Sequence, residues 1–422
     1  MNGWDHKRLM LAGLAWASAT AFAADRGSAS DLLTIDVFVP GGADTAPQTF
    51  SDAETLIDSL DALGYESINP TYDDTGAATA FINFRGVDLE VDYPDGGETV
   101  IFRVPSAGIE ETFDDFATRA ANEDALVDFV ESNQGGIFTE VLQEAVATTP
   151  NDPVAGTPNS LMFKMAEADF TMGTTIGTLP SPVAASNDGY DRTRPSSGLN
   201  ARFGRFTADG TEANVIDLPL NYSRPLDDPR YAVILDFPLT YVQAEDTDSF
   251  SGSLGLGLRL PLYDNWTLTP SIRGGLVGSL DLGSAAALGG VSLVSNYRFS
   301  YEEFNFGIGN SIAYIQTFPL DIDGVEFDYD LQNIVVRNGI SVSGPLGFKV
   351  LGQDATWEGS VVNTQFFGDD VYAENVTDIA VSFGTVQSLN GFTWDSVRVG
   401  VTYTFSTDSD FEGFRLNFGY RF

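Results

Sequence analysis

The sequence predicts a small α+β domain followed by an all-β, antiparallel transmembrane barrel of about twelve strands. Apolar alternation from residue 199 to residue 422, with glycines at many intervening positions, predicts the barrel. Helical spacing of apolar residues before residue 147 predicts a separately folded unit. The expected boundaries are a domain over 31–147, a linker or plug segment over 148–198 and a barrel over 199–422.

The first 23 residues have the features of a secretory signal peptide. Lys7 and Arg8 precede a short apolar run, which ends in the small-residue pattern Ala21-Phe22-Ala23. The run is too short to cross a bilayer as a helix, and no later stretch reaches about eighteen uninterrupted apolar residues. We therefore expect residues 1–23 to be removed and any membrane crossing to use strands.

Composition excludes several classes of function. The net charge of −39 makes nucleic acid an implausible partner. The chain has no cysteine, and its single histidine, His6, lies in the expected signal peptide. Histidine-dependent hydrolysis and histidine- or thiolate-bound zinc are therefore not expected, and we predict that the protein is not an enzyme. The acidity is consistent with general solubility, a saline habitat or a surface that attracts divalent cations.

Residues 31–147 predict a small sheet with helices. Ser51 to Glu54 forms a capping-box pattern ahead of a helix of about thirteen residues that ends near Gly64. Alternation over 87–93 and 100–104 around a turn predicts a hairpin, and 81–84 supplies a third strand. Further short helices are expected from Phe113 to Ala120, from Leu126 to Val130 and from Ile137 to Ala145.

The segment from 148 to 195 is rich in Pro, Gly, Thr, Ser and Asn, with one apolar patch from Leu161 to Met165. This pattern predicts a linker with a short helix. Such a segment either lies inside the barrel as a plug or hangs below it.

The barrel strands are predicted from period-two alternation, which is clearest in the leucines between 254 and 262 and in the aromatics between 414 and 422. The predicted strands are 199–207, 212–222, 230–243, 250–262, 266–279, 287–299, 304–317, 326–342, 346–362, 372–386, 394–405 and 413–422. An even number places both barrel ends on the same side of the membrane, the periplasmic one. The loops on the outward side are then 208–211, 244–249, 280–286, 318–325, 363–371 and 406–412.

The C-terminal segment resembles the last strand of Gram-negative outer-membrane β-barrel proteins. Phe418, Tyr420 and Phe422 continue an alternation that begins at Phe414, and a terminal phenylalanine is typical of that family. The resemblance implies recognition of these residues by the barrel-assembly machinery. The strand count is similar to that of autotransporter-type barrels, but the long repetitive passenger usual in that group is missing.

Arginines at the polar positions of the strands are the most suggestive cluster. Alternation points six of them into the lumen: Arg259, Arg273, Arg298, Arg398, Arg415 and Arg421. They predict either a passage for anionic solutes or a structural network with lumen carboxylates such as Asp217, Asp236 and Glu374.

A weaker pattern lies near residue 321. Asp321, Asp323 and Glu326 place oxygen ligands around a glycine, as calcium loops do, although the full calcium-loop spacing is missing. Ca²⁺ or other divalent cations at the outer loops are therefore an expectation, and a solvated acidic loop is the simpler interpretation.

Three functions follow as expectations. The first is a narrow channel or transporter for small solutes such as anions, with a periplasmic domain that plugs, regulates or docks. The second is a non-conducting barrel that anchors this domain in the membrane, and the third is an autotransporter-like translocator. The expected partners are outer-membrane lipid, the barrel-assembly machinery and a periplasmic protein.

Overall fold

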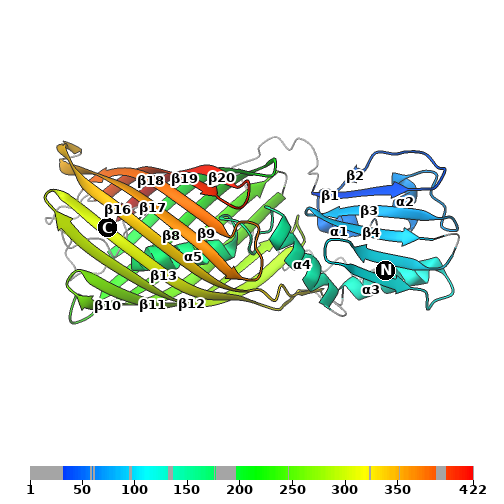
Figure 1. The fold of residues 1–422 in the computed structure, drawn as a ribbon, viewed down its shortest axis with the longest axis horizontal. Helices are drawn as coiled ribbons and strands as arrows, with labels where there is room; N and C mark the ends of the chain where they lie inside the picture. The colour runs from blue at the N-terminus through cyan, green and yellow to red at the C-terminus, as the bar shows by residue number, and fades with distance from the viewer. Residues whose placement is uncertain are drawn as a thin grey trace.

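The computed structural model describes residues 32–57, 59, 62–94, 97–131, 136–174, 176, 196–245, 247–322, 325–350, 352–385 and 396–421. The predicted signal peptide lies outside the described residues. Figure 1 shows a long barrel with a smaller domain stacked on one of its open ends. Among the described residues no helix is long and apolar enough to cross a membrane.

The N-terminal domain is a six-stranded sheet covered on one face by helices. The strands lie in the order β2-β1-β3-β4-β5-β6. Their bounds are β1 Leu33–Phe38, β2 Gln48–Thr49, β3 Ala78–Phe84, β4 Val87–Tyr93, β5 Val100–Val104 and β6 Ile109–Phe113. The helices are α1 Ala53–Ile57, α2 Ala62–Ile68, α3 Arg119–Glu131 and α4 Ile137–Thr148. The alternate apolar positions of the strands and the inner faces of the helices form one core.

Several details of the predicted domain are wrong. The helix expected up to Gly64 is two shorter helices, α1 and α2, and Asp52 rather than Ser51 caps the first, because its carboxylate accepts a hydrogen bond from Thr55 N. Phe113 ends strand β6 instead of starting a helix. Strands β1 and β2 were not predicted, although Leu33, Ile35 and Val37 alternate with Thr34 and Asp36 and could have identified β1; β2 has only two residues.

The barrel closes with twelve antiparallel strands, as predicted. Strand β20 pairs with β7, so no strand edge remains open to lipid. The strands are β7 Ser196–Ala208, β8 Thr211–Pro225, β9 Ala232–Ala244, β10 Thr247–Tyr263, β11 Trp266–Ser279, β12 Ser284–Tyr301, β13 Phe304–Phe318, β16 Gln332–Val350, β17 Gln353–Gly368, β18 Asn375–Thr385, β19 Ser396–Ser406 and β20 Glu412–Arg421.

One predicted strand is displaced along the chain. The segment 326–342 was expected to be a single strand, but β16 begins at Gln332. Residues before it form a separate small hairpin, β14 Leu320–Ile322 with β15 Val325–Phe327. This hairpin continues the alternation of the neighbouring strands, so the sequence pattern alone does not separate it from β16.

Helix α5, Leu161–Gly173, follows the domain and runs inside the barrel (Figure 1). It contacts strands β9 to β13 and β16, and most of its side chains are buried. Of the two placements considered for this segment, the structure has the one inside the lumen.

Candidate functional site

The outer surface of the barrel is apolar between two aromatic rims. Leucines and other large apolar residues along the strands are exposed, for example Leu254 and Ile272 at 59% each. Tyr263 stacks on Trp266 at one rim, and Tyr241 contacts Phe250 near the other. Because such a surface is stable only against hydrocarbon and aromatic rings favour the membrane interface, this belt is the lipid-facing surface of a transmembrane barrel.

Helix α5 lies in the interior and packs against the wall. Two glycines of β10 make room for it: a Cβ at Gly257 would lie 2.3 Å from Met172 Sδ, and one at Gly255 would lie 2.9 Å from Met172 Cε. On the opposite side, Phe170 approaches Gly339 in the same way, at 2.9 Å from its missing Cβ. The inward-facing glycines of the strands therefore leave the room that the side chains of α5 occupy.

Three charged residues of α5 are buried and paired with the barrel wall. Glu167 accepts from Arg415 at 2.9 Å and lies 3.1 Å from Arg202, so two strands that close the barrel hold one carboxylate. Lys164 Nζ donates to Asp217 on β8 at 2.7 Å. Buried charges are tolerated only when they are paired, and each of these has its counter-charge on a different element.

The third charged residue of α5 enters a shared cluster. Arg273 donates to Asp169 of α5 and to Asp236 of β9, each at 2.8 Å. The predicted pairing of Asp236 with a lumen arginine is therefore seen in the structure. One guanidinium thus joins the helix to the wall.

Arg337 and Asp378 complete the network within the wall. Arg337 Nη2 lies 3.4 Å from Asp378, which also lies 3.2 Å from Arg415. The guanidinium of Arg337 sits over the rings of Phe163 and Phe170, with centroids at 5.0 and 5.5 Å. The cation–π contact adds a helix–wall attraction that needs no carboxylate.

The six predicted lumen arginines have different surroundings. Arg273 and Arg415 belong to the network around α5. Arg259 donates to the carbonyls of Pro229 and Arg230 in the β8–β9 loop, and Arg398 donates to Ser382 and Thr356. Arg298 is half-buried, and the side chain of Arg421 lies outside the described residues.

Sequence reasoning missed Arg202 and Arg337, both of which face the lumen. Arg202 follows the alternation of Leu199, Ala201 and Phe203, which would have identified it. Arg337 follows a run of three apolar residues that obscures the alternation. The predicted partner Asp217 pairs with a lysine of α5, and Glu374 is exposed in the β17–β18 loop, so its assignment to the lumen was wrong.

The remaining predicted sites stay predictions. Asp321 is paired in register with Glu326, but Asp323 and the side chain of Glu326 lie outside the described residues. No group of three or more potential metal-ligating side chains occurs in the part of the chain that the structure describes. Phe418 faces outward on β20, and Phe422 lies outside the described residues.

The N-terminal domain docks on the barrel mouth through one buried arginine. Arg85 occupies the β3–β4 turn with φ of 59° and is fully buried. Its Nη1 lies 3.2 Å from Asp152, in the segment that leads to α5, and 3.5 Å from the hydroxyl of Tyr329, just before β16. Tyr329 also bonds Asp152 at 3.2 Å and Ser284 at 2.7 Å. Burial, reinforced by the charge of Asp152, raises the pKa of Tyr329 above 10, so the phenol keeps its proton.

Backbone hydrogen bonds extend this junction. Ala53 N of the domain donates to Asp281 O of the β11–β12 loop at 3.0 Å. In the β17–β18 loop, Tyr372 N donates to Val146 O at 2.9 Å, and Ala373 N donates to Gly156 O at 2.8 Å. Three loops at one end of the barrel thus hold the domain and residues 149–160, the lead to α5.

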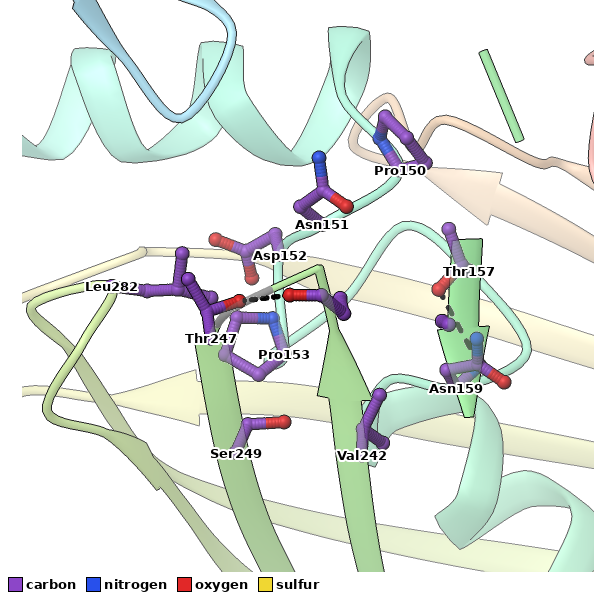
Figure 2. Close-up of a pocket in the computed structure, with 12 residues that line it drawn as sticks. Pro150, Asn151, Asp152, Pro153, Thr157, Asn159, Val242, Thr247, Ser249 and Leu282 are labelled. Carbon is purple, nitrogen blue, oxygen red and sulfur yellow. Dashed lines mark hydrogen bonds between the residues drawn. The ribbon is translucent and has the colours of Figure 1, made fainter. Parts of the chain in front are cut away.

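A small cavity lies between this lead and the strands. Figure 2 shows the cavity beside Asp152, Thr157 and Thr247, whose volume is ≈ 20 Å³. Such a cavity holds about one water molecule. No solute path follows from it.

The domain lies at one end of the barrel, and the C-terminus of strand β20 lies at the opposite end (Figure 1). Gly198, near the start of β7, pairs with Arg421, at the end of β20, so these two strand ends lie together. The domain instead contacts the loops at 281, 329 and 372, which belong to the end predicted to face outward. The domain and the two terminal strand ends of the barrel therefore lie on opposite sides of the membrane. The prediction that both are periplasmic cannot hold in this structure.

No protein-family model and no curated protein sequence matches the chain. Among solved structures, it is similar to the β-domain of the Bordetella autotransporter BrkA, with 11% identity, TM-score 0.41 and coverage of 54% of this chain and 98% of that one. It is also similar to the translocator domain of the autotransporter NalP from Neisseria meningitidis, with 10% identity, TM-score 0.39 and coverage of 55% and 90%. A third is an outer membrane channel from Pseudomonas putida F1, with 14% identity, TM-score 0.38 and coverage of 57% and 98%. Its closed twelve-strand barrel, apolar outside and charged inside, gives the protein the architecture of a transmembrane β-barrel with a small N-terminal α/β domain.

Proposed function

We propose that the barrel is a membrane anchor, closed in its docked state, that displays the N-terminal domain on the cell surface. The observation that carries this proposal is the path of α5 through the lumen. Leu161, at its start, packs near Gly275 towards the domain end, and Ile176, beyond its end, packs on Gly307 near the opposite rim. The chain thus passes from the domain, through the barrel, towards the end where β7 begins.

The orientation is argued from the loops. Transmembrane bacterial barrels have short periplasmic turns and longer outer loops. At the end away from the domain, β10–β11 and β12–β13 are joined by two-residue turns. At the domain end, β7–β8 and β9–β10 are also joined by two-residue turns, but the β13–β16 connection has thirteen residues, contains the β14–β15 hairpin and is longer than the longest connection at the other end, the ten residues between β18 and β19. This difference favours an outer position for the domain, as in the autotransporter-like alternative, over the periplasmic position expected from sequence.

A narrow channel for small anionic solutes is the second candidate. The arginines of the lumen wall favour it, but α5 must leave the lumen before solutes pass. A non-enzymatic role is part of both proposals, because the chain beyond residue 23 has neither histidine nor cysteine.

Antibody labelling of intact cells tests the proposed display. One epitope tag is inserted at the exposed Gly41–Gly42 turn of the domain, and a matched tag is inserted in the β8–β9 loop between Asp227 and Asp228. We expect the domain tag to be labelled in intact cells and the loop tag only after the outer membrane is permeabilised. The reverse pattern would place the domain in the periplasm and defeat the proposal.

A further inference from the structure

The charged residues of the barrel wall form pairs among themselves as well as with α5. Arg273 keeps Asp236 at 2.8 Å, and Arg415 keeps Asp378 at 3.2 Å, without any atom of the helix. Both pairs join different strands of the wall. Withdrawal of α5 therefore leaves each of these arginines with a carboxylate.

The two wall residues that depend most on α5 are neighbours. Arg202 is paired with Glu167, and Asp217 with Lys164. In the β7–β8 ladder Arg202 and Asp217 are directly opposite each other. Side chains at such positions have Cβ atoms about 4.5–5.5 Å apart, within reach of an ion pair. When the helix leaves, these two charges can therefore pair across the ladder.

The charged residues of the wall can therefore form ion pairs both when α5 is present and when it is absent. A helix that never left the lumen would need only the pairs between the wall and α5. Among the described wall residues of the network, four arginines (Arg202, Arg273, Arg337 and Arg415) face three aspartates (Asp217, Asp236 and Asp378). The vacated wall then carries one excess positive charge, which favours anions.

The domain controls the lead to α5. Asp152 accepts from Val154 N at 2.8 Å, and Pro153 O and Val154 O accept from the first two residues of the helix, Leu161 and Met162. Arg85 of the domain holds Asp152 from the other side, and both side chains are withdrawn from solvent. The domain, the lead and the helix are therefore one continuous hydrogen-bonded chain.

We propose that α5 is a removable plug and that the docked domain is its gate, so that undocking of the domain releases α5 and opens a passage for small anions. This inference does not depend on which side of the membrane the domain occupies. Its failure therefore leaves the display proposal untouched.

Single cysteines in the full chain test the gate, because the native chain contains none. In protein reconstituted in lipid vesicles, Leu282→Cys reports on the barrel mouth and Ala166→Cys reports on α5; both positions are about 2% exposed in the docked state. The probe is a water-soluble maleimide, and the readout is the labelling rate. Chloride conductance is recorded in planar bilayers from the same preparations.

Arg85→Gln is the variant that undocks, and Arg103→Gln is the matched control, since Arg103 pairs with Glu90 and Glu110 within the domain. We expect Arg85→Gln to raise the labelling rate at both reporters by about tenfold or more, because it breaks a buried ion pair, and to produce anion-preferring openings. Arg103→Gln leaves both rates near those of the parent. Tyr329→Phe, on the barrel side, undocks without altering the domain's own residues.

Three results would overturn the inference. Faster labelling at 282 with an unchanged rate at 166 means that the domain does not hold α5. Unchanged labelling rates at both positions in Arg85→Gln and Tyr329→Phe mean that this junction does not hold the domain in its docked position. Faster labelling at both positions without anion-preferring conductance means that the vacated lumen is not the proposed passage.

Discussion

Arg85 Nη1 lies 3.2 Å from Asp152 Oδ2, and this buried ion pair joins the N-terminal domain to the segment that enters the barrel. Neither side chain reaches solvent in the docked arrangement. Because a buried charge is costly once its partner is removed, the pair makes docking specific for this one position of the domain. The docked domain and the helix in the lumen are therefore connected through Asp152, and together they close the barrel.

Removal of the carboxylate that binds two wall arginines is expected to destabilise the barrel. Glu167→Gln leaves Arg202 and Arg415 without their helix partner, at a cost of about 3–5 kcal/mol in the free energy of unfolding. Urea unfolding of the reconstituted protein measures this change. Glu212→Gln is the matched control: it removes an exposed pair with Arg205, so its effect is expected to be less than about 1 kcal/mol. Equal effects of the two variants would contradict a stabilising role for the lumenal pairs.

A methyl group at the end of α5 is expected to disturb the seating of the plug. A Cβ at Gly173 would lie 2.4 Å from Val294 Cβ on β12, so Gly173→Ala forces the helix or the strand to move, at about 1–3 kcal/mol. Gly274→Ala, whose Cβ meets nothing closer than 3.9 Å, serves as the control. Thermal unfolding gives the comparison, and adding Val294→Gly to Gly173→Ala should restore part of the loss. A neutral Gly173→Ala would mean that α5 lies elsewhere in the lumen.

Docking is expected to weaken at alkaline pH. Burial holds the pKa of Tyr329 above its ordinary value of 10, so the protonated phenol stabilises the docked state below pH 10. As the pH rises above 10, the undocked phenol ionises and this contribution is lost. Labelling of Leu282→Cys, with rates corrected for thiolate content, should therefore increase above pH 10. Tyr329→Phe, which is already undocked, should show fast labelling without this increase, and an identical rise in both proteins would assign the increase to other groups.

A charge on the middle of the lipid-facing surface is expected to impair membrane insertion. Leu256, near the centre of β10, is 44% exposed on the barrel exterior. Leu256→Arg should cost about 2–4 kcal/mol, whereas Leu262→Arg, near the end of the same strand, should cost about 0–1 kcal/mol. Folding yield into vesicles, monitored by urea titration, measures both. Equal tolerance at the two positions would contradict the assigned belt.

Much of the barrel could be predicted because its signal is local. Each strand that contacts lipid on one face and the lumen on the other must alternate, as the leucines from 254 to 262 and the residues of β20 do. The same alternation points Arg273 and Arg415 inward before any strand pairing is known. It does not separate the β14–β15 hairpin from β16, because the alternation continues through both segments and only the strand pairing divides them.

The sequence by itself determined the closed barrel, its apolar exterior and the inward direction of the polar side chains, because membrane and lumen act on each residue through a period of two. The tertiary structure decided that 161–173 fills the lumen and that the domain docks at the end opposite to the C-terminal strand end. Arg85 and Tyr329 are 244 residues apart in the chain, and Arg415 and Glu167 are 248 apart. Contacts at such separations depend on the register in which the barrel closes around the helix, and no local pattern encodes them.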